Sequence, residues 1–241
     1  MSDGVLLIHA FPLDARMWEG QRIGSAVIAP DLPGFGMAPT AGDTLTMAIA
    51  ARHCLAAADA AGLDRVVVCG LSMGGYVALE LWRQAPERFA GLILANTRAG
   101  ADSPEAAEGR RALAERLRTE GNVLAAAPPP LLAEGASQEL QNRVKGWVAD
   151  QSAAAIAAAS LGMAERPDST GDLAEITVPT LVITSDGDRL IAPELTTPMA
   201  DQIPGARLEV LTGVGHLSNV EAAGRFTQLL RDHAGACGVT V

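Results

Sequence analysis

The most constraining feature of this sequence is a repeated alternation between short apolar runs and longer segments with helical periodicity. The apolar runs are four to six residues long and too continuously apolar to leave one face to water. This is typical of strands buried on both sides of a parallel sheet, and the intervening helices imply right-handed crossovers in a doubly wound α/β fold. The expected strands are Val5–Ala10, Ala26–Ala29, Arg65–Cys69, Gly91–Ala95, Thr180–Thr184 and Arg207–Leu211. The helices expected among them are Leu45–Ala61, Gly74–Ala85, Pro193–Gln202 and Asn219–His233.

One interval, residues 98–177, contains no convincing strand. Its helical segments are expected at Ser103–Glu120, Gln138–Asp150 and Ala153–Glu165, with a rigid corner at the triple proline 128–130. These helices could simply fill space on the surface. We favour a helical cap inserted between two strands, because ligands bind beyond the carboxyl ends of the strands in open α/β sheets. The expected division is therefore a core formed by residues 1–97 and 178–241 and a cap insertion formed by residues 98–177.

The composition excludes several classes of protein. The chain has 241 residues, of which 49% are hydrophobic and 19% charged, as in a globular protein. A net charge of −10 argues against a nucleic-acid partner or an anionic membrane surface. The sequence shows neither a signal peptide nor an apolar run long enough to span a bilayer, and Cys54, Cys69 and Cys237 lack the spacing of a disulfide framework or a zinc site. We therefore expect a cytoplasmic protein with free thiols, no metal and no cofactor.

A serine stands at the junction of an expected strand and helix. Gly70-Leu71-Ser72-Met73-Gly74 fits the pattern G-x-S-x-G, directly after the run that ends at Cys69. The serine could be an ordinary helix N-cap, or a nucleophile on a sharp turn where the helix dipole also favours an oxyanion. The strand–turn–helix context favours the nucleophile.

A serine nucleophile needs a base, and the base needs a carboxylate to orient it. His216 lies in a glycine-containing loop after the last expected strand, whereas His53 and His233 fall within helices as surface or half-buried residues. Asp186 and Asp188 both follow the strand Thr180–Thr184, and either could be a turn former around a glycine. We favour His216 as the base and Asp188 as the acid.

Five motifs in this order carry a family resemblance. They are His9-Ala10-Phe11-Pro12, Asp31-Leu32-Pro33-Gly34-Phe35-Gly36, Gly70-Leu71-Ser72-Met73-Gly74-Gly75, Asp188-Arg189-Leu190-Ile191-Ala192-Pro193 and Gly213-Val214-Gly215-His216-Leu217-Ser218-Asn219. With them the sequence resembles the α/β-hydrolase family, in its branch of small serine esterases and 3-oxoadipate enol-lactonases. The resemblance implies a mostly parallel sheet of about six strands flanked by helices, and a triad of Ser72, Asp188 and His216.

The resemblance also implies how a substrate would be held. The backbone N–H groups of Phe11 and Met73 would form the oxyanion hole, although Ala10 replaces the usual glycine. His9 and Asp31 would be structural. The family normally has two further strands before the first strand here, so either that edge hairpin is missing or the chain is truncated. Trp18, Trp147 and Met163 are candidates for an apolar substrate pocket, although each could equally be core.

The residues after the expected base suggest a local helix cap. Ser218 and Glu221 match a capping box, in which the two side chains would satisfy reciprocal backbone N–H groups. They therefore receive no catalytic role in this prediction.

The function expected from these residues is hydrolysis of a small carboxylic ester or lactone through an acyl-enzyme. Alternatives on the same triad are a carbon–carbon bond hydrolase, a perhydrolase, or a ligand sensor with slow turnover. The partner would be a small-molecule substrate, and the sequence leaves the oligomeric state open.

Overall fold

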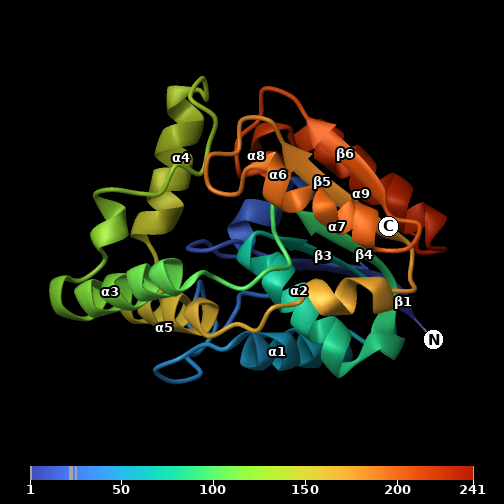
Figure 1. The fold of residues 1–241 in the computed structure, drawn as a ribbon, viewed down its shortest axis with the longest axis horizontal. Coiled ribbons are helices and arrows are strands. Elements are labelled where there is room, and N and C mark those ends of the chain that lie inside the picture. Colours follow the sequence, from blue (N-terminus) through green and yellow to red (C-terminus); the bar gives the residue numbers. More distant parts are fainter. Residues whose placement is uncertain (1, 22–23, 25, 241) are drawn as a thin grey trace.

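Six strands form one parallel sheet in the order β2-β1-β3-β4-β5-β6 (Figure 1). The structure is a computed structural model that describes residues 2–21, 24 and 26–240. The strands are β1 (Asp3–Ile8), β2 (Val27–Ile28), β3 (Arg65–Leu71), β4 (Phe89–Ala95), β5 (Thr180–Ser185) and β6 (Arg207–Leu211). The predicted parallel sheet of about six strands is confirmed. Residues 1 and 241, the outer limits of the predicted core, lie outside the described residues.

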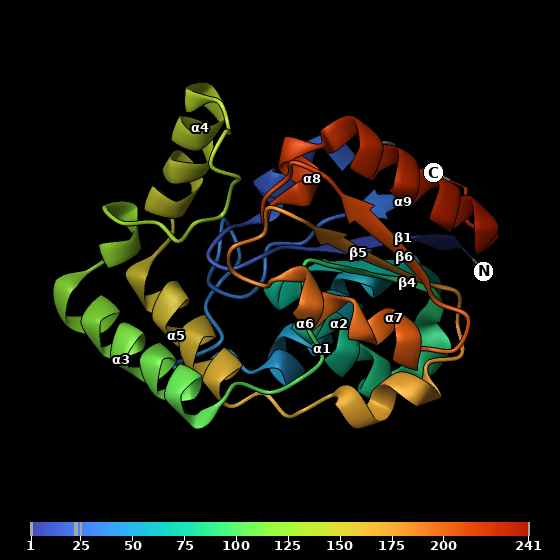
Figure 2. The same ribbon diagram turned by 45° about the horizontal axis from the view of Figure 1, so that its top comes forward.

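Helices cover both faces of the sheet. Figures 1 and 2 show α1, α2 and α7 on one face, and η1, α8 and α9 on the other. The helices outside the β4–β5 connection are η1 (Ala15–Gln21), α1 (Met47–Ala60), α2 (Met73–Gln84), η2 (Pro86–Arg88), α6 (Pro193–Thr196), α7 (Pro198–Gln202), α8 (Ser218–Glu221) and α9 (Ala223–Ala236). None of the helices in the described part is both long and apolar enough to cross a membrane.

The hydrophobic core consists of two clusters, one on each face of the sheet. Successive residues of a strand point to opposite faces and therefore belong to different clusters. Leu6 and Val68 belong to the cluster packed under α1 and α2, whereas Leu7 and Val67 belong to the cluster packed under η1 and α9. All four side chains are essentially inaccessible to solvent. The continuous apolar runs in the sequence therefore reflect two buried sheet faces, as expected.

The last strand is an exception to this pattern. Leu208 is 38% exposed and Val210 is 47% exposed, so β6 is not buried on both sides. It stands at the edge of the sheet and pairs only with β5 among the described strands. An edge strand lacks one neighbour, and its apolar residues do not by themselves reveal this.

Two expected helices are each divided into two. Pro198 lacks the N–H that a continuous helix would need there, and it begins α7 directly after α6. Ala222, with φ −111° and ψ 45°, lies outside helical geometry and separates α8 from α9. The prediction of one continuous helix at 193–202 and another at 219–233 is therefore wrong. Helices do occupy both ranges, as two shorter helices in each.

The connection between β4 and β5 holds a group of helices, of which all but the last lie beyond the ends of the strands. It contains α3 (Pro104–Glu120), η3 (Val123–Ala125), α4 (Gln138–Ala149), α5 (Ala153–Ala164) and η4 (Thr170–Glu175). Figure 2 shows α3, α4 and α5 standing at one end of the sheet, and α3 packs against α5. The start of α1 contacts α5 closely, because a Cβ on Gly162 would come within 1.7 Å of Leu45 O.

The buried thiols give a test of this packing. Burial raises the pKa of Cys54 to about 12 and raises the pKa of Cys69 as well, so both stay protonated near neutral pH. Cys237 is only partly buried. We expect a thiol reagent such as DTNB at pH 8 to label about one cysteine of the native protein and all three after denaturation. Rapid labelling of Cys54 or Cys69 in the native state would contradict the observed packing.

Candidate active site

Ser72 occupies a strained turn between β3 and α2. Its backbone has φ 58° and ψ −116°, a conformation that is rare for a residue with a side chain. Although Ser72 is the residue before the helix, its hydroxyl makes no capping hydrogen bond. Of the two interpretations left open by the sequence, the structure therefore does not support a helix cap and leaves the hydroxyl free for chemistry.

The glycines around Ser72 are required by backbone contacts. A Cβ on Gly70 would lie 2.2 Å from Gly74 O, and one on Gly74 would lie 2.1 Å from Ile8 O. A Cβ on Gly75 would lie 2.4 Å from the hydroxyl of Thr97. No real Cβ tolerates such distances, so the turn can pack against β1 and the end of β4 only with glycine at these positions.

His216 and Asp188 form a buried pair beyond the ends of β5 and β6. His216 Nδ1 lies 2.7 Å from Asp188 Oδ2, and the two side chains are 1% and 0% exposed. An Nδ1–H that donates to the carboxylate leaves Nε2 available as an acceptor. The pair thus has the arrangement of an oriented general base.

Asp188 is held ionised by several donors. Its Oδ1 accepts hydrogen bonds from the N–H groups of Leu190 (2.9 Å) and Ile191 (3.0 Å). Its Oδ2 accepts from Asn96 Nδ2 at 3.0 Å as well as from His216. Burial alone would raise the pKa of Asp188, but the hydrogen bonds and charge of His216, with the bonds from Ile191 and Asn96, outweigh it and hold this pKa below its usual range.

The competing carboxylate takes a different role. Asp186 Oδ1 accepts a hydrogen bond from Gly213 N at 2.7 Å, which links the turn after β5 to the turn after β6. The structure thus places Asp188, and not Asp186, beside His216. This agrees with the preference for Asp188 in the sequence analysis, although both aspartates follow the same strand and their different partners depend on the direction of each side chain.

Asn96 is a site residue that the sequence analysis missed. It follows β4 with a φ of 45° and donates from Nδ2 to Ser185 Oγ (2.9 Å) and to Asp188. Its Oδ1 accepts from Ser218 Oγ at 2.6 Å. The available signal was an Asn directly after a buried strand, a residue type that tolerates positive φ, but that signal does not reveal its partners.

The expected capping box at Ser218 and Glu221 is wrong. Ser218 donates to Asn96, whereas Glu221 accepts from Gly215 N at 2.9 Å and from Ala133 N at 3.1 Å. Burial raises the pKa of Glu221. Glu221 therefore attaches the His216 loop to the segment between η3 and α4, and Leu217 N reinforces this attachment by donating to Leu131 O at 2.9 Å.

The predicted oxyanion donors lie on neighbouring elements. β1 pairs with β3 so that Ile8 stands opposite Gly70, which brings the loop after β1 beside the turn that carries Ser72. Met73 is the first residue of α2, where a backbone N–H has no partner within the helix. Phe11 follows β1 by three residues and lines the same cavity as Ser72.

His9 and Asp31 have structural partners. His9 Nε2 accepts from Leu32 N at 2.9 Å and Nδ1 lies 3.0 Å from Ala10 O, so the ring holds two loops together. Burial lowers the pKa of His9, which favours the neutral form that this bonding needs. Asp31 accepts from the N–H groups of Ala15 and Met37. His233 is buried, more deeply than the surface or half-buried position expected.

A cavity of about 240 Å³ opens onto Ser72 and His216. Its ten lining residues come from the core and from the helical segment: Phe11, Ser72, Tyr76, Arg98, Arg110, Pro129, Met163, Leu190, Ile191 and His216. No hydrogen bond joins the Ser72 hydroxyl to His216 within the described part of the chain, and such bonds often tighten only when substrate binds. Within the same part, no group of three or more His, Cys, Asp or Glu side chains is placed to hold a metal ion.

Of the three predicted pocket residues, only Met163 lines this cavity. Trp18 is fully buried and packs against Phe226 at a ring-centroid distance of 5.8 Å, so it is part of the core. Trp147, on α4, packs against that same apolar cluster and is not among the residues that line the cavity of Ser72 and His216. These two assignments are corrected, because an aromatic residue in the sequence does not show whether its face points to a core or to a cavity.

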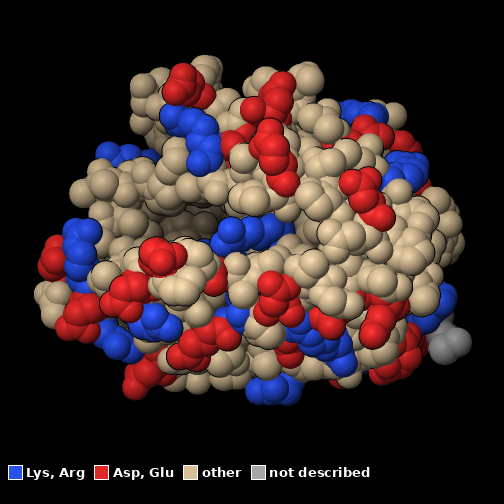
Figure 3. Space-filling view, viewed as in Figure 1, with Lys and Arg blue, Asp and Glu red and all other residues tan. Residues whose placement is uncertain are grey.

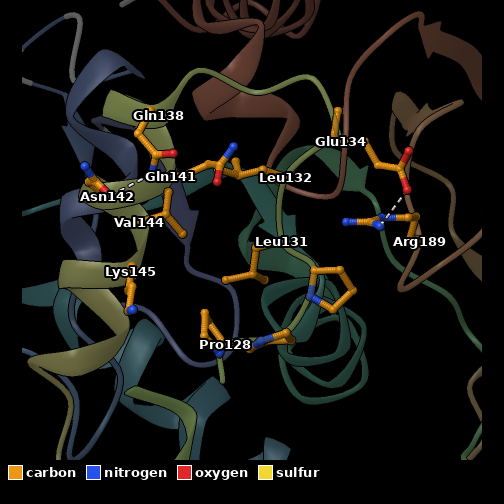
Figure 4. Close-up of a pocket in the computed structure, with 13 residues that line it drawn as sticks. Pro128, Leu131, Leu132, Glu134, Gln138, Gln141, Asn142, Val144, Lys145 and Arg189 are labelled. Atoms are coloured by element: carbon orange, nitrogen blue, oxygen red, sulfur yellow. Dashed lines mark hydrogen bonds and ion pairs between the residues drawn. The ribbon is translucent and has the colours of Figure 1, made fainter. Parts of the chain in front are cut away.

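A second cavity, of about 360 Å³, lies beside the first. Figure 4 shows its wall formed by α4 residues such as Gln138 and Lys145, by the segment that begins at Pro128, and by the ion pair of Glu134 and Arg189. It shares Pro129 with the cavity that contains Ser72 and His216, but it is lined by none of Ser72, Asp188 and His216. The triple proline thus forms part of the partition between the two cavities.

The comparisons with known proteins agree with this architecture. Residues 5–229 match the alpha/beta hydrolase family. The chain is similar to a putative carbamate hydrolase, RutD, of Variovorax paradoxus (30% identical, covering 95% of this chain and 91% of that protein). It is similar in structure to a thermophilic esterase from Thermogutta terrifontis with malate bound (39% identical, TM-score 0.93, covering 98% and 90% of the two chains). It is also similar to an enol-lactonase from Burkholderia xenovorans LB400 (27% identical, TM-score 0.86, covering 98% and 92%). The chain belongs to the alpha/beta hydrolase family.

Proposed function

We propose that this protein is a serine hydrolase that cleaves a small carboxylic ester or lactone. The observation that carries the proposal is the buried 2.7 Å contact between His216 and Asp188 in a site whose cavity also contains Ser72. The hydroxyl of Ser72 needs a base to become a nucleophile, and the oriented imidazole supplies one.

The residues divide the reaction into two steps. In the first, His216 Nε2 takes the Ser72 proton as the oxygen attacks the carbonyl carbon, and the proton then passes to the leaving alcohol or lactone oxygen. In the second, His216 takes a proton from water as the water oxygen attacks the acyl carbon, and it then gives this proton to Ser72 Oγ as the acyl–oxygen bond breaks and the acid is released. Asp188 stabilises the imidazolium in both steps, and the N–H groups of Phe11 and Met73 stabilise the oxyanions.

The size and origin of the cavity support a small substrate. Its volume of about 240 Å³ is below the range of about 300–1,000 Å³ typical of drug-sized ligands. Similar proteins include an esterase and an enol-lactonase, which supports ester or lactone chemistry. Because Arg110 and Met163 contribute to the cavity from α3 and α5, we further propose that the segment 98–177 acts as the substrate cap.

The first test asks whether Ser72 is activated. A fluorophosphonate probe is expected to label the wild-type protein at Ser72 and to leave the Ser72→Ala variant unlabelled, as judged by intact-mass spectrometry. Turnover of short p-nitrophenyl esters and of small lactones then separates an enzyme from a ligand sensor. A wild-type protein that resists the probe would contradict the proposed nucleophile.

The second test compares the two aspartates. We expect Asp188→Asn to lower kcat on the order of 10³–10⁴-fold, because the amide no longer orients or stabilises the charged imidazole. Asp186→Asn keeps an acceptor for Gly213 N and is expected to stay within about threefold of wild type. The reverse order in steady-state kinetics is incompatible with the proposed triad.

The third test concerns Asn96 as a positioning residue. Asn96→Gly keeps the freedom to adopt positive φ but removes the amide that donates to Asp188, so we expect kcat to fall about tenfold. Asn96→Ala adds backbone strain and is expected to lower the thermal midpoint as well. If Asn96→Gly has wild-type kcat, the amide does not position the acid.

A further inference from the structure

Two arginines stand in the cavity that contains Ser72 and His216. Arg98 follows the end of β4, and Arg110 lies on α3, so one comes from the sheet region and the other from the helical segment above it. Their side chains are each 25% exposed, and no acidic residue among those the structure describes lines this cavity. Figure 3 shows a hollow on one face of the molecule with Lys or Arg atoms along its edge.

A single carboxylate holds these arginines in place. Asp102, whose side chain is 1% exposed, pairs through Oδ1 with Arg98 and through Oδ2 with Arg110 Nε. Arg166 Nη1 also lies 2.9 Å from Asp102 Oδ1, while its guanidinium stacks over the ring of Tyr76 at 4.1 Å. The arginine side chains are therefore fixed before any ligand arrives, which reduces the entropy that binding would cost.

The pairing leaves positive charge and donors unused. Three guanidinium groups share the carboxylate of Asp102, and Asp168 is a second negative charge that acts on Arg166. Positive charge is therefore in excess in this cluster, in a protein with a net charge of −10. Arg98 Nε is buried without a hydrogen-bond partner, and the Nη1 and Nη2 groups of Arg110 have no partner within the described residues. A buried donor such as Arg98 Nε is unfavourable without an acceptor, whereas the unpaired Nη groups of the partly exposed Arg110 are available to a ligand.

We propose that the cavity recognises a substrate that carries, besides its ester or lactone group, a second and ionised carboxylate. Arg98 and Arg110 would bind that carboxylate, and Met163 and Ile191 would contact the short apolar chain that joins the two groups. This assignment rests on the proposed function for the position of the reacting carbonyl, but the anion site itself does not depend on the chemistry of Ser72.

The geometry favours a carboxylate over a neutral polar group. A guanidinium presents planar paired donors that match the two oxygens of a carboxylate, and a charge-assisted bond is roughly twice as strong as a neutral one. If the cluster were only structural, its ion pairs would connect the end of β4 to α3. That role does not explain why Arg110 has unpaired donors beside the cavity.

Binding can be measured without turnover. Succinate and its neutral analogue succinamide would be titrated into the wild-type protein by calorimetry, with Arg110→Gln as the test variant and Arg111→Gln as the control. Arg111 is the next residue of α3, is 50% exposed and pairs with Glu108. We expect succinate to bind about tenfold or more tightly than succinamide, Arg110→Gln to lose that difference, and Arg111→Gln to keep it.

Equal binding of succinate and succinamide by the wild-type protein overturns the inference, and this comparison needs no variant to fold. Inorganic phosphate that binds as tightly as succinate overturns the assignment of a carboxylate. Equal losses in Arg110→Gln and Arg111→Gln also overturn it, with circular dichroism used to verify that both variants are folded.

The kinetic test uses two esters of similar shape. Monomethyl succinate carries a carboxylate where methyl 4-methylpentanoate carries an isopropyl group, so the ratio of their kcat/KM values isolates the charge. We expect the ratio to favour the charged ester in the wild type and to fall about tenfold or more in Arg110→Gln, but not in Arg111→Gln. A ratio that is unchanged in Arg110→Gln overturns the inference.

The two proposals fail in different ways. If Ser72 is not a nucleophile, neither ester is hydrolysed but succinate still binds. If the anion site is wrong, the esters are hydrolysed without a preference for charge and succinate does not bind selectively.

Discussion

The close backbone contact between the start of α2 and the ends of β1 and β3 is the constraint on which the site depends. A side chain at Gly70 or Gly74 would collide with backbone atoms 2.1–2.2 Å away, so the helix can begin there only because these residues are glycine. The contact forces Ser72 into a positive φ and brings the loop that contains Phe11 beside it. A strained residue at such a turn is maintained because the surrounding backbone over-determines it.

The second half of the site is built at the ends of β4, β5 and β6. Asn96, Asp188 and Ser218 come from three separate segments and are joined by buried hydrogen bonds, with His216 as the outer member. Glu221 then connects the His216 loop to the segment between η3 and α4. The core and the helical segment thus position the proposed base together. A displacement of that segment would therefore change the position of the imidazole.

The positive charges in the cavity bear on which substrates the site would select. A protein with a net charge of −10 repels anions in general, yet Arg98 and Arg110 place an excess of positive charge beside Ser72. Asp102 orients these arginines without neutralising all of them. In the proposed function, Ser72 and His216 would act on the reacting carbonyl of the substrate, and the two arginines would bind its second, charged group.

Much of the fold could be predicted from the sequence, because its signals are local. Continuous apolar runs without polar alternation indicated the six strands. Glycines at fixed spacing indicated the turn at Ser72. Order along the chain then selected His216 as the base and left two aspartates for the acid. The failures concern properties that need a neighbour: the exposure of Val210 on an edge strand, the burial of Trp18 in the core, and the true partners of Ser218 and Glu221.

The sequence by itself determined the α/β architecture and the residue types available for chemistry, since backbone conformation and side-chain periodicity are encoded by adjacent residues. Only the tertiary structure decided that Asp188 and not Asp186 meets His216, and that Asn96 completes the network. It alone brought Arg98 and Arg110 into the cavity of Ser72. The physical reason is that side-chain direction at the end of a strand, and contact between segments far apart in the chain, are set by packing and not by local sequence.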